Sequence, residues 1–131
     1  IEMKETYESI LPKVYIDTDL IHQVLWNLFV NSLDAMPDGG QIKIMVRKAT
    51  LFLRDAVEIV ISDTGTGIPP HELDKIFEPF HTTKSEGTGL GLSMVQRIID
   101  DHGGTVDVKS KEGKGTTFYI KLPVGNEKLA V

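Results

Sequence analysis

The chain has 131 residues, 40% of them hydrophobic and 25% charged, which is the composition of one ordinary globular domain. Its net charge of −5, without any block of basic residues, argues against nucleic acid and an anionic membrane surface as direct partners. It has no cysteine, which excludes disulfides and thiolate metal sites, and no apolar run is long enough to span a membrane. Because residue 1 is isoleucine rather than methionine, we expect residues 1–131 to be a single domain of a longer protein.

The first predicted elements are two strands and a long helix. Residues 1–13 are expected to hold an amino-terminal strand, and Val14–Ile16 a second, short one. Asp17 or Thr18 can cap a helix whose inward positions recur at helical spacing: Ile21, Val24, Leu25, Leu28, Ser32 and Ala35. This helix should end near Met36, because the breaker Pro37-Asp38-Gly39-Gly40 follows.

A polar stripe runs along the same predicted helix. Gln23, Asn27, Asn31 and Asp34 follow one another at spacings of four, four and three, so they share one face. Asparagine is a poor helix former, and its burial without a partner costs free energy. The stripe is therefore a candidate for function, with a solvated face as the alternative.

The rest of the chain alternates between strands, turns and shorter helices. Val57–Ile61 is the most apolar segment and is expected to be the central strand. The other elements expected are strands over 41–50, 105–110 and 117–122, a turn over 51–55, a short helix over 71–77, a mobile loop over 80–87, a helix over 89–101 closed by Gly103–Gly104, and a frayed tail over 124–131. Because consecutive strands imply hairpins, we predict an α+β fold: a two-layer α/β sandwich with a mixed, mainly antiparallel sheet and helices on one face.

Two glycine-rich stretches suggest a ligand site. Asp63 ends the central strand and faces the turn Gly65–Gly67, while Gly87–Leu92 opens the helix over 89–101. Free N–H groups at a helix N-terminus bind anions, and glycine lets the backbone approach a ligand without a Cβ clash. We therefore predict a nucleotide site with Asp63 at the base end and Gly87–Leu92 at the phosphate end. Neither stretch matches the Walker loop or the dinucleotide fingerprint.

Five motifs in order resemble the N box, G boxes and F box of sensor histidine kinases: Asn27–Asn31, Asp63–Gly67, Phe77–Phe80, Gly87–Leu92 and Gly115–Phe118. The resemblance covers nearly the whole chain and implies the catalytic and ATP-binding domain of a two-component kinase. Its fold would be the Bergerat ATP-binding fold that gyrase B, MutL and the heat-shock chaperone ATPase share. The segment Pro79–Lys84 is similar to the corresponding loop of nitrogen-regulation-type kinases.

The resemblance also implies roles for matching residues. Asn31 would ligate Mg²⁺ through its amide oxygen, which suits a hard cation, and Asn27 would touch a phosphate of ATP. Asp63 would accept a hydrogen bond from the adenine amine. The remaining nucleotide contacts implied are Gly65 and Gly67 at the base, Thr116 near Asp63, and Gly87, Thr88, Gly89, Leu90, Gly91 and Leu92 at the phosphates. Lys84 is a candidate catalytic cation beside Asn27 and Asn31, with an exposed surface lysine as the alternative.

The implied reaction is transfer of the γ-phosphoryl group of Mg-ATP, leaving ADP, to a histidine on a separate dimerisation and histidine phosphotransfer domain of the same parent protein. This domain would be cytoplasmic, whether or not the parent is anchored in a membrane. A response regulator would be an indirect partner. No histidine of this chain stands in the family's acceptor context, although His71-Glu72 has the residue pair. Asp34 departs from the basic residue that many members carry. The alternatives are a gyrase- or MutL-like ATPase, which would carry glutamate at position 27, and a degenerate nucleotide-binding scaffold.

Overall fold

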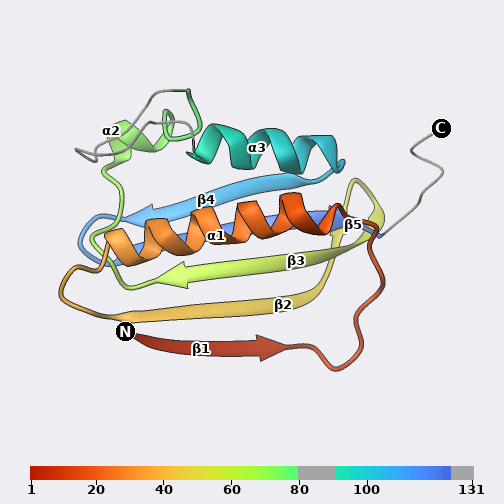
Figure 1. Cartoon of the computed structure of the whole chain (residues 1–131), viewed down its shortest axis with the longest axis horizontal. Coiled ribbons are helices and arrows are strands. Elements are labelled where there is room, and N and C mark those ends of the chain that lie inside the picture. Colours follow the sequence, from red (N-terminus) through yellow and green to blue (C-terminus); the bar gives the residue numbers. More distant parts are fainter. Residues whose placement is uncertain (80–90, 125–131) are drawn as a thin grey trace.

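The computed structural model describes residues 1–79 and 91–124, and these form a sheet with helices packed on it (Figure 1). The elements in chain order are β1 (Glu2–Tyr7), α1 (Thr18–Asp34), β2 (Gln41–Leu51), β3 (Arg54–Asp63), α2 (Pro70–Leu73), α3 (Gly91–Asp101), β4 (Thr105–Lys111) and β5 (Gly115–Pro123). No helix within the described ranges is both long enough and apolar enough to cross a membrane.

The sheet has five strands in the order β1-β2-β3-β5-β4. β1 pairs with β2 in parallel, whereas every other pair is antiparallel. The apolar segment Val57–Ile61 lies in β3, the middle strand, where both edges are paired. The predicted α+β sandwich with a mixed, mainly antiparallel sheet and helices on one face is therefore confirmed (Figure 1).

The ends of α1 are fixed by local chemistry. Asp17 is the N-cap, and its Oδ1 accepts from the backbone N–H groups of Asp19 at 3.0 Å and Leu20 at 3.1 Å. These bonds satisfy donors that have no partner inside the helix. At the other end, Ala35 caps the helix and donates its N–H to the Asn31 carbonyl. Both boundaries agree with the sequence prediction.

A second bond holds the start of α1 to the end of α3. The backbone N–H of Asp17 donates to Nε2 of His102 at 3.0 Å, while Nδ1 of His102 lies 2.8 Å from the Ile98 carbonyl oxygen. His102 therefore contacts the start of α1 through one ring nitrogen and the last turn of α3 through the other. The two helices are thus joined at the end of the molecule away from Asp63.

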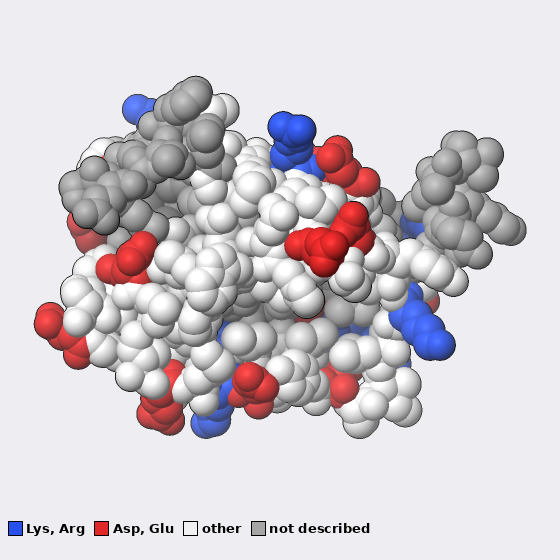
Figure 2. Space-filling view, in the orientation of Figure 1, with Lys and Arg blue, Asp and Glu red and all other residues white. Residues whose placement is uncertain are grey.

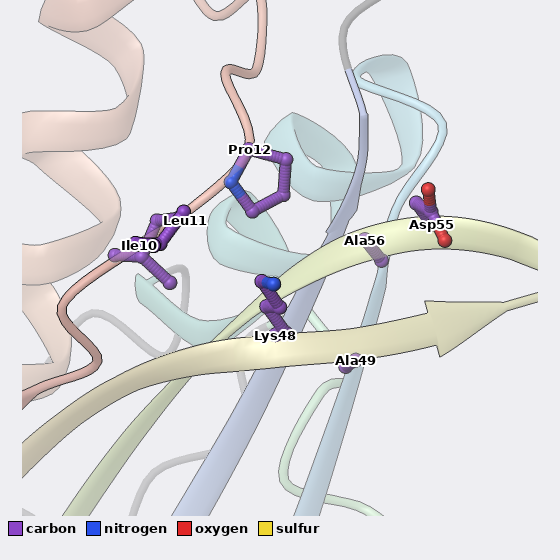
Figure 3. A pocket seen from close by; sticks show the side chains of 7 residues that line it. All are labelled: Ile10, Leu11, Pro12, Lys48, Ala49, Asp55 and Ala56. Carbon is purple, nitrogen blue, oxygen red and sulfur yellow. The ribbon is translucent and has the colours of Figure 1, made fainter.

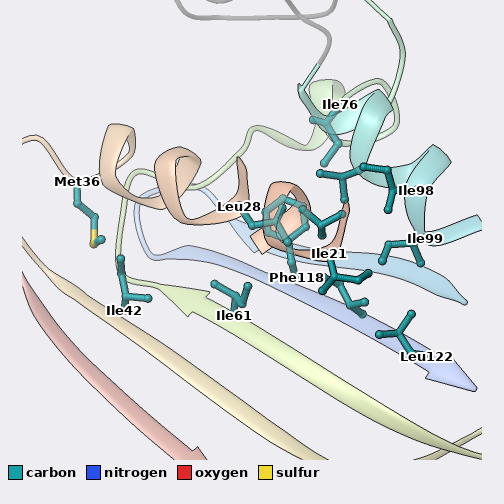
Figure 4. Packing of buried hydrophobic residues seen from close by; sticks show 13 residues of the cluster. Ile21, Leu28, Met36, Ile42, Ile61, Ile76, Ile98, Ile99, Phe118 and Leu122 are labelled. Atoms are coloured by element: carbon teal, nitrogen blue, oxygen red, sulfur yellow. The ribbon is translucent and has the colours of Figure 1, made fainter. Parts of the chain in front are cut away.

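The core lies between the helices and the sheet (Figure 4). Leu28 of α1, Ile42 of β2 and Ile99 of α3 are completely buried, and Phe118 of β5 packs edge-on against Phe77. α1 and α3 therefore each present an apolar stripe to the apolar side of the strands.

Two predicted elements differ in the structure. Val14–Ile16 is not a strand, because it pairs with no described strand. Its alternation comes instead from packing, since Val14 and Ile16 contact the core while Tyr15 is 63% exposed. The helix expected over 71–77 is only the four residues of α2, and turns follow it. Ile76, in the turns after α2, is nevertheless buried in the core.

Three other expectations fall wholly or partly on residues that the structure does not describe. The loop over 80–87 and the first two residues of the helix over 89–101 lie outside the described ranges. Within the expected tail, Val124 donates its N–H to the Asp55 carbonyl at 2.8 Å, and residues 125–131 lie outside.

Candidate nucleotide-binding site

The carboxylate of Asp63 is the best-anchored polar group of the candidate site. Asp63 ends β3 and is only 7% exposed. Its Oδ1 accepts from the backbone N–H of Gly65 at 2.9 Å and of Thr116 at 3.2 Å, and its Oδ2 accepts from the Ser32 hydroxyl at 2.9 Å. Donors from α1, from the turn after β3 and from β5 therefore hold one carboxylate in a single orientation.

The turn after Asp63 is wedged between two other parts of the chain. A Cβ added at Gly65 would lie 2.6 Å from both Cβ and the carbonyl oxygen of Ala35, and the N–H of Thr66 bonds to that oxygen at 3.0 Å. Gly67 has a φ of +73°, and a Cβ there would overlap the Lys111 carbonyl. The two glycines thus let the turn approach the C-cap of α1 and the β4–β5 turn.

A chain of hydroxyl groups supports Thr116 behind the carboxylate. Thr116 is 6% exposed, and its Oγ1 lies 2.8 Å from Oγ of Ser110 on β4. The Ser110 hydroxyl donates to the Gly115 carbonyl at 3.0 Å and accepts from the Ile68 N–H at 2.8 Å. Thr116 lies near Asp63, as the sequence predicts, because its backbone N–H donates to the carboxylate. Its side chain contacts Ser110 instead and so joins β5 to β4.

The polar stripe of α1 runs from Asp63 towards α3. Asn31 is half-buried and directly precedes Ser32, whose hydroxyl holds Asp63. Asn27, one turn earlier, lies against the first residue of α3, because a Cβ added at Gly91 would overlap its Oδ1. Asn27 and Asn31, the two middle members of the stripe, are thus half-buried, whereas Gln23 and Asp34 at its ends are exposed.

The structure describes part of the predicted phosphate end. Gly91 and Leu92 begin α3, and the Leu92 side chain packs against the core. Lys84, Gly87, Thr88, Gly89 and Leu90 lie outside the described residues.

Sequence reasoning missed two hydroxyl groups of the site. Ser32 was placed among the inward positions of α1 only because of its spacing, yet it is 2% exposed and bonds to Asp63. A hydroxyl on an otherwise apolar helix face needs a buried partner, and that requirement was the available signal. Ser110 carried no such signal, since its partners come from other strands.

Replacing Ser32 with alanine is expected to lower the free energy of unfolding by about 1.5–3 kcal/mol, because Asp63 loses a donor to a buried charge. Ser62→Ala is the matched control: that half-buried hydroxyl bonds the neutral Thr117 hydroxyl at 2.8 Å, so the expected loss is only about 0.5–1.5 kcal/mol. Urea unfolding of both variants measures the difference. Equal losses would show that the Ser32–Asp63 hydrogen bond contributes no more stability than the bond between the neutral Ser62 and Thr117 hydroxyls.

A separate cavity of about 290 Å³ lies at the other end of the sheet (Figure 3). It is lined by Ile10, Leu11, Pro12, Lys48, Ala49, Asp55 and Ala56. Asp55 and Asp63 are eight residues apart on β3, which corresponds to about 26 Å along an extended strand. This cavity is therefore not part of the Asp63 site.

Comparisons with known proteins agree with this geometry. Residues 16–126 match the family described as histidine kinase-, DNA gyrase B- and HSP90-like ATPase. The chain is 43% identical over 124 residues to sensor histidine kinase ZraS of Escherichia coli (strain K12), covering 95% of this chain and 26% of that protein. It is 48% identical over 136 residues to sensor kinase CckA of Brucella abortus (strain 2308), covering 94% and 14%.

Solved structures show the same relationship. The catalytic domain of histidine kinase ThkA, in a nucleotide-free form, matches with a TM-score of 0.82 at 35% identity, covering 97% of this chain and 81% of that one. Full-length ShkA in complex with AMPPNP matches with a TM-score of 0.78 at 29% identity, covering 93% and 25%. The chain spans about a quarter or less of the two curated sensor kinases. It therefore belongs to the histidine kinase-, DNA gyrase B- and HSP90-like ATPase family, as a catalytic, ATP-binding domain of the sensor histidine kinase type.

Proposed function

We propose that this domain binds Mg-ATP and transfers the γ-phosphoryl group to a histidine on a separate dimerisation and histidine phosphotransfer domain of its parent protein. The nucleophilic imidazole nitrogen forms the new bond to phosphorus, the bond to the bridging oxygen breaks, and ADP leaves. A response regulator then receives the phosphoryl group. Residues 1–131 act as one cytoplasmic catalytic domain that touches neither nucleic acid nor the membrane.

The observation that supports this proposal is the number of hydrogen-bond donors at the Asp63 carboxylate. Its two oxygens offer about four acceptor positions, and three are taken by Ser32, Gly65 and Thr116. Residues 1–79 and 91–124 provide no fourth donor, so one acceptor position is available to a ligand. The exocyclic amine of adenine is such a donor, and a fixed, charged acceptor at hydrogen-bond distance favours it over a carbonyl oxygen at the same ring position.

The asparagines of α1 suit the phosphate end. Asn31 would hold Mg²⁺ through its amide oxygen, and Asn27, beside the first residue of α3, would contact a phosphate. In residues 1–79 and 91–124 no group of three or more histidine or acidic side chains could hold a metal ion. One amide oxygen with phosphate oxygens and water suits Mg²⁺, which prefers oxygen ligands and keeps several waters. When bound, Mg²⁺ neutralises charge that develops on the phosphates.

The proposal favours transfer over rapid hydrolysis. An amide at position 27 cannot take a proton from water, so the general-base contribution of about 10²–10⁴-fold is missing. An imidazole acceptor supplies its own nucleophile, and phosphoryl transfer depends mainly on positioning and charge neutralisation. The same domain is therefore suited to a kinase and poorly suited to a gyrase-like ATPase.

The test is incubation with γ-labelled ATP. We expect label to appear only when a separately prepared dimerisation domain of the parent is added, and only on that domain. Calorimetric titration with ADP and ATP, with and without a chelator of Mg²⁺, establishes binding in parallel. Rapid phosphate release by the isolated domain, abolished in Asn31→Ala, would favour the ATPase alternative, and no binding at millimolar nucleotide would overturn the proposal.

A further inference from the structure

The turn between β2 and β3 places two large apolar side chains in solvent. Leu51 and Arg54 are the last paired residues of the two strands, so Phe52 and Leu53 form a two-residue hairpin loop. Phe52 is 78% exposed and Leu53 is fully exposed. Their φ angles are +50° and +66°, in the left-handed region where hairpin loops of this length normally carry asparagine, aspartate or glycine. Both the residue types and the backbone of this turn are therefore unusual.

A turn that only connected two strands would not need these residues. Left-handed backbone is strained for a residue with a Cβ, and an Asn-Gly pair would form the same loop without that strain. Exposed phenyl and isobutyl groups also gain nothing from burial within their own domain. Strained residues are concentrated at functional sites, and neighbouring exposed apolar side chains mark interaction sites. These properties indicate that the tip, which we define as Phe52 and Leu53, contacts a partner.

The cavity of about 290 Å³ lies beside the tip, at the same end of the sheet (Figure 3). A cavity of about 150 Å³ holds a benzene ring, and small-molecule sites begin at about 300 Å³. This cavity therefore has room for one or two apolar side chains, and the tip of its own chain does not fill it, because both side chains are exposed. Residues 10–12 line one side of it, and four residues that flank the tip line the other: Lys48 and Ala49 on β2, and Asp55 and Ala56 on β3.

The position of the tip beside the cavity favours a second copy of this chain as the partner. Leu53 is two residues from Asp55 and Phe52 is four residues from Lys48, so an apolar projection and a hollow of suitable size are neighbours on one surface. A two-fold axis between them would set each tip into the opposite cavity at the same time. Such an interface is isologous, because the same patch of both copies is buried and neither is left over.

The charges at the cavity also suit a second copy. Its lining has one cation, Lys48, and one anion, Asp55, both on exposed residues, and neither forms an ion pair within residues 1–79 and 91–124. A surface with one charge of each sign is complementary to itself across a two-fold axis, whereas a strongly acidic or basic partner would meet one like charge. Acidic and basic side chains are scattered over the face in Figure 2, without a block of either sign.

We propose that two copies of this domain pair through this end of the sheet, with the tip of each copy in the cavity of the other. Each copy contributes one turn and one cavity, so the interface is small and the isolated domains pair weakly. The inference rests on the proposed function, in which a dimerisation domain of the parent holds two copies together and raises their effective concentration. Asp63 lies at the other end of β3, so pairing leaves the nucleotide site open.

Replacement of the tip should separate pairing from stability. Sedimentation equilibrium of the domain, from micromolar to millimolar concentration, measures its self-association. Phe52→Asn combined with Leu53→Gly should weaken this association by about tenfold or more, because both apolar anchors are lost. The same variant should unfold at the same or a higher urea concentration, since its loop residues suit left-handed backbone. Trp26→Asn is the matched control: Trp26 is 66% exposed on α1, outside the tip and the cavity, so association should change by less than about twofold.

Exchange of the two charges tests whether the partner is a second copy. Lys48→Glu gives the cavity two anions and Asp55→Lys gives it two cations, so each variant alone should self-associate about threefold or more weakly. A mixture of the two variants should regain the original association within about twofold, because each cavity then meets the opposite charges. If the mixture pairs as weakly as the separate variants, the two cavities do not face each other and the proposal is wrong.

ADP titration of the same samples keeps this inference distinct from the proposed function. A domain that binds ADP and stays monomeric at millimolar concentration would overturn the pairing and leave the proposed function standing. Association that persists in the Phe52→Asn, Leu53→Gly variant would place the contact on another surface and would also overturn it. Vesicles of anionic phospholipid are the last probe: a monomeric domain that binds them through the tip would make the partner a membrane rather than a second copy.

Discussion

Asp63→Asn is expected to weaken ADP and ATP binding by about 10- to 150-fold while the domain stays folded. Asparagine has the same shape as aspartate, so its oxygen can still accept from the N–H groups of Gly65 and Thr116. Its NH₂ group then replaces Oδ2, where it can donate to the Ser32 oxygen. The hydrogen bonds within the protein are kept, so the substitution should lower nucleotide affinity rather than stability.

Two losses combine in this variant. The negative charge disappears, and the position left for the adenine amine is now occupied by a donor that cannot accept its hydrogen. A hydrogen bond to a charged group contributes about 1.5–3 kcal/mol, which sets the expected fold-change. Calorimetric titration with ADP measures the affinity, and urea unfolding checks that stability is retained.

Glu58→Gln is the matched control for Asp63→Asn. Glu58 is the other buried carboxylate of β3, at 5% exposure, and it pairs with Arg47 on the side of the sheet away from the helices. Its loss of charge should leave nucleotide affinity unchanged, even if it costs stability. If Asp63→Asn binds ADP as tightly as the unchanged domain, Asp63 does not contact the base.

The second large effect is expected from Gly115→Ala, which should lower the free energy of unfolding by about 2–6 kcal/mol. Gly115 has a φ of +136°, and strain of this kind costs about 1–3 kcal/mol for a residue with a side chain. A Cβ there would also overlap the Asp63 carbonyl and lie 3.1 Å from Cα of Thr64, and overpacking costs about 1–3 kcal/mol more. Domains of this size are stable by only about 5–15 kcal/mol.

Gly113→Ala separates the two causes. Gly113 lies in the β4–β5 turn, two residues before Gly115, and has a φ of +83°, but a Cβ there would have no atom within 4 Å. Its replacement should cost only the left-handed conformation, about 1–2 kcal/mol. Urea unfolding compares the variants, and ADP titration should show weaker binding for Gly115→Ala alone, because its Cβ displaces the end of β3. If both variants lose a similar free energy of unfolding, the overlap of the new Cβ with Asp63 does not contribute to the loss.

The local elements of this protein follow from its sequence. The helical spacing from Ile21 to Ser32, the cap at Asp17 and the breaker after Met36 set α1 correctly, because helix formation depends on residues within a few positions of one another. The apolar run over 57–61 likewise identified the central strand. The ordered motifs identified the family, and the position of Asp63 at the end of β3 followed from the strand itself.

Only the tertiary structure decided which partners these elements have. Val14–Ile16 has the alternation of a strand but pairs with no strand in the described part of the chain, and pairing partners are distant in sequence. The three donors to Asp63 come from α1, its own turn and β5, so no local pattern could name them. Gly65 likewise needs its small size because α1 ends beside it. The exposed flank at Trp26 also appears only once the sheet and helices are assembled, because exposure is a property of the packed layers rather than of spacing along one helix.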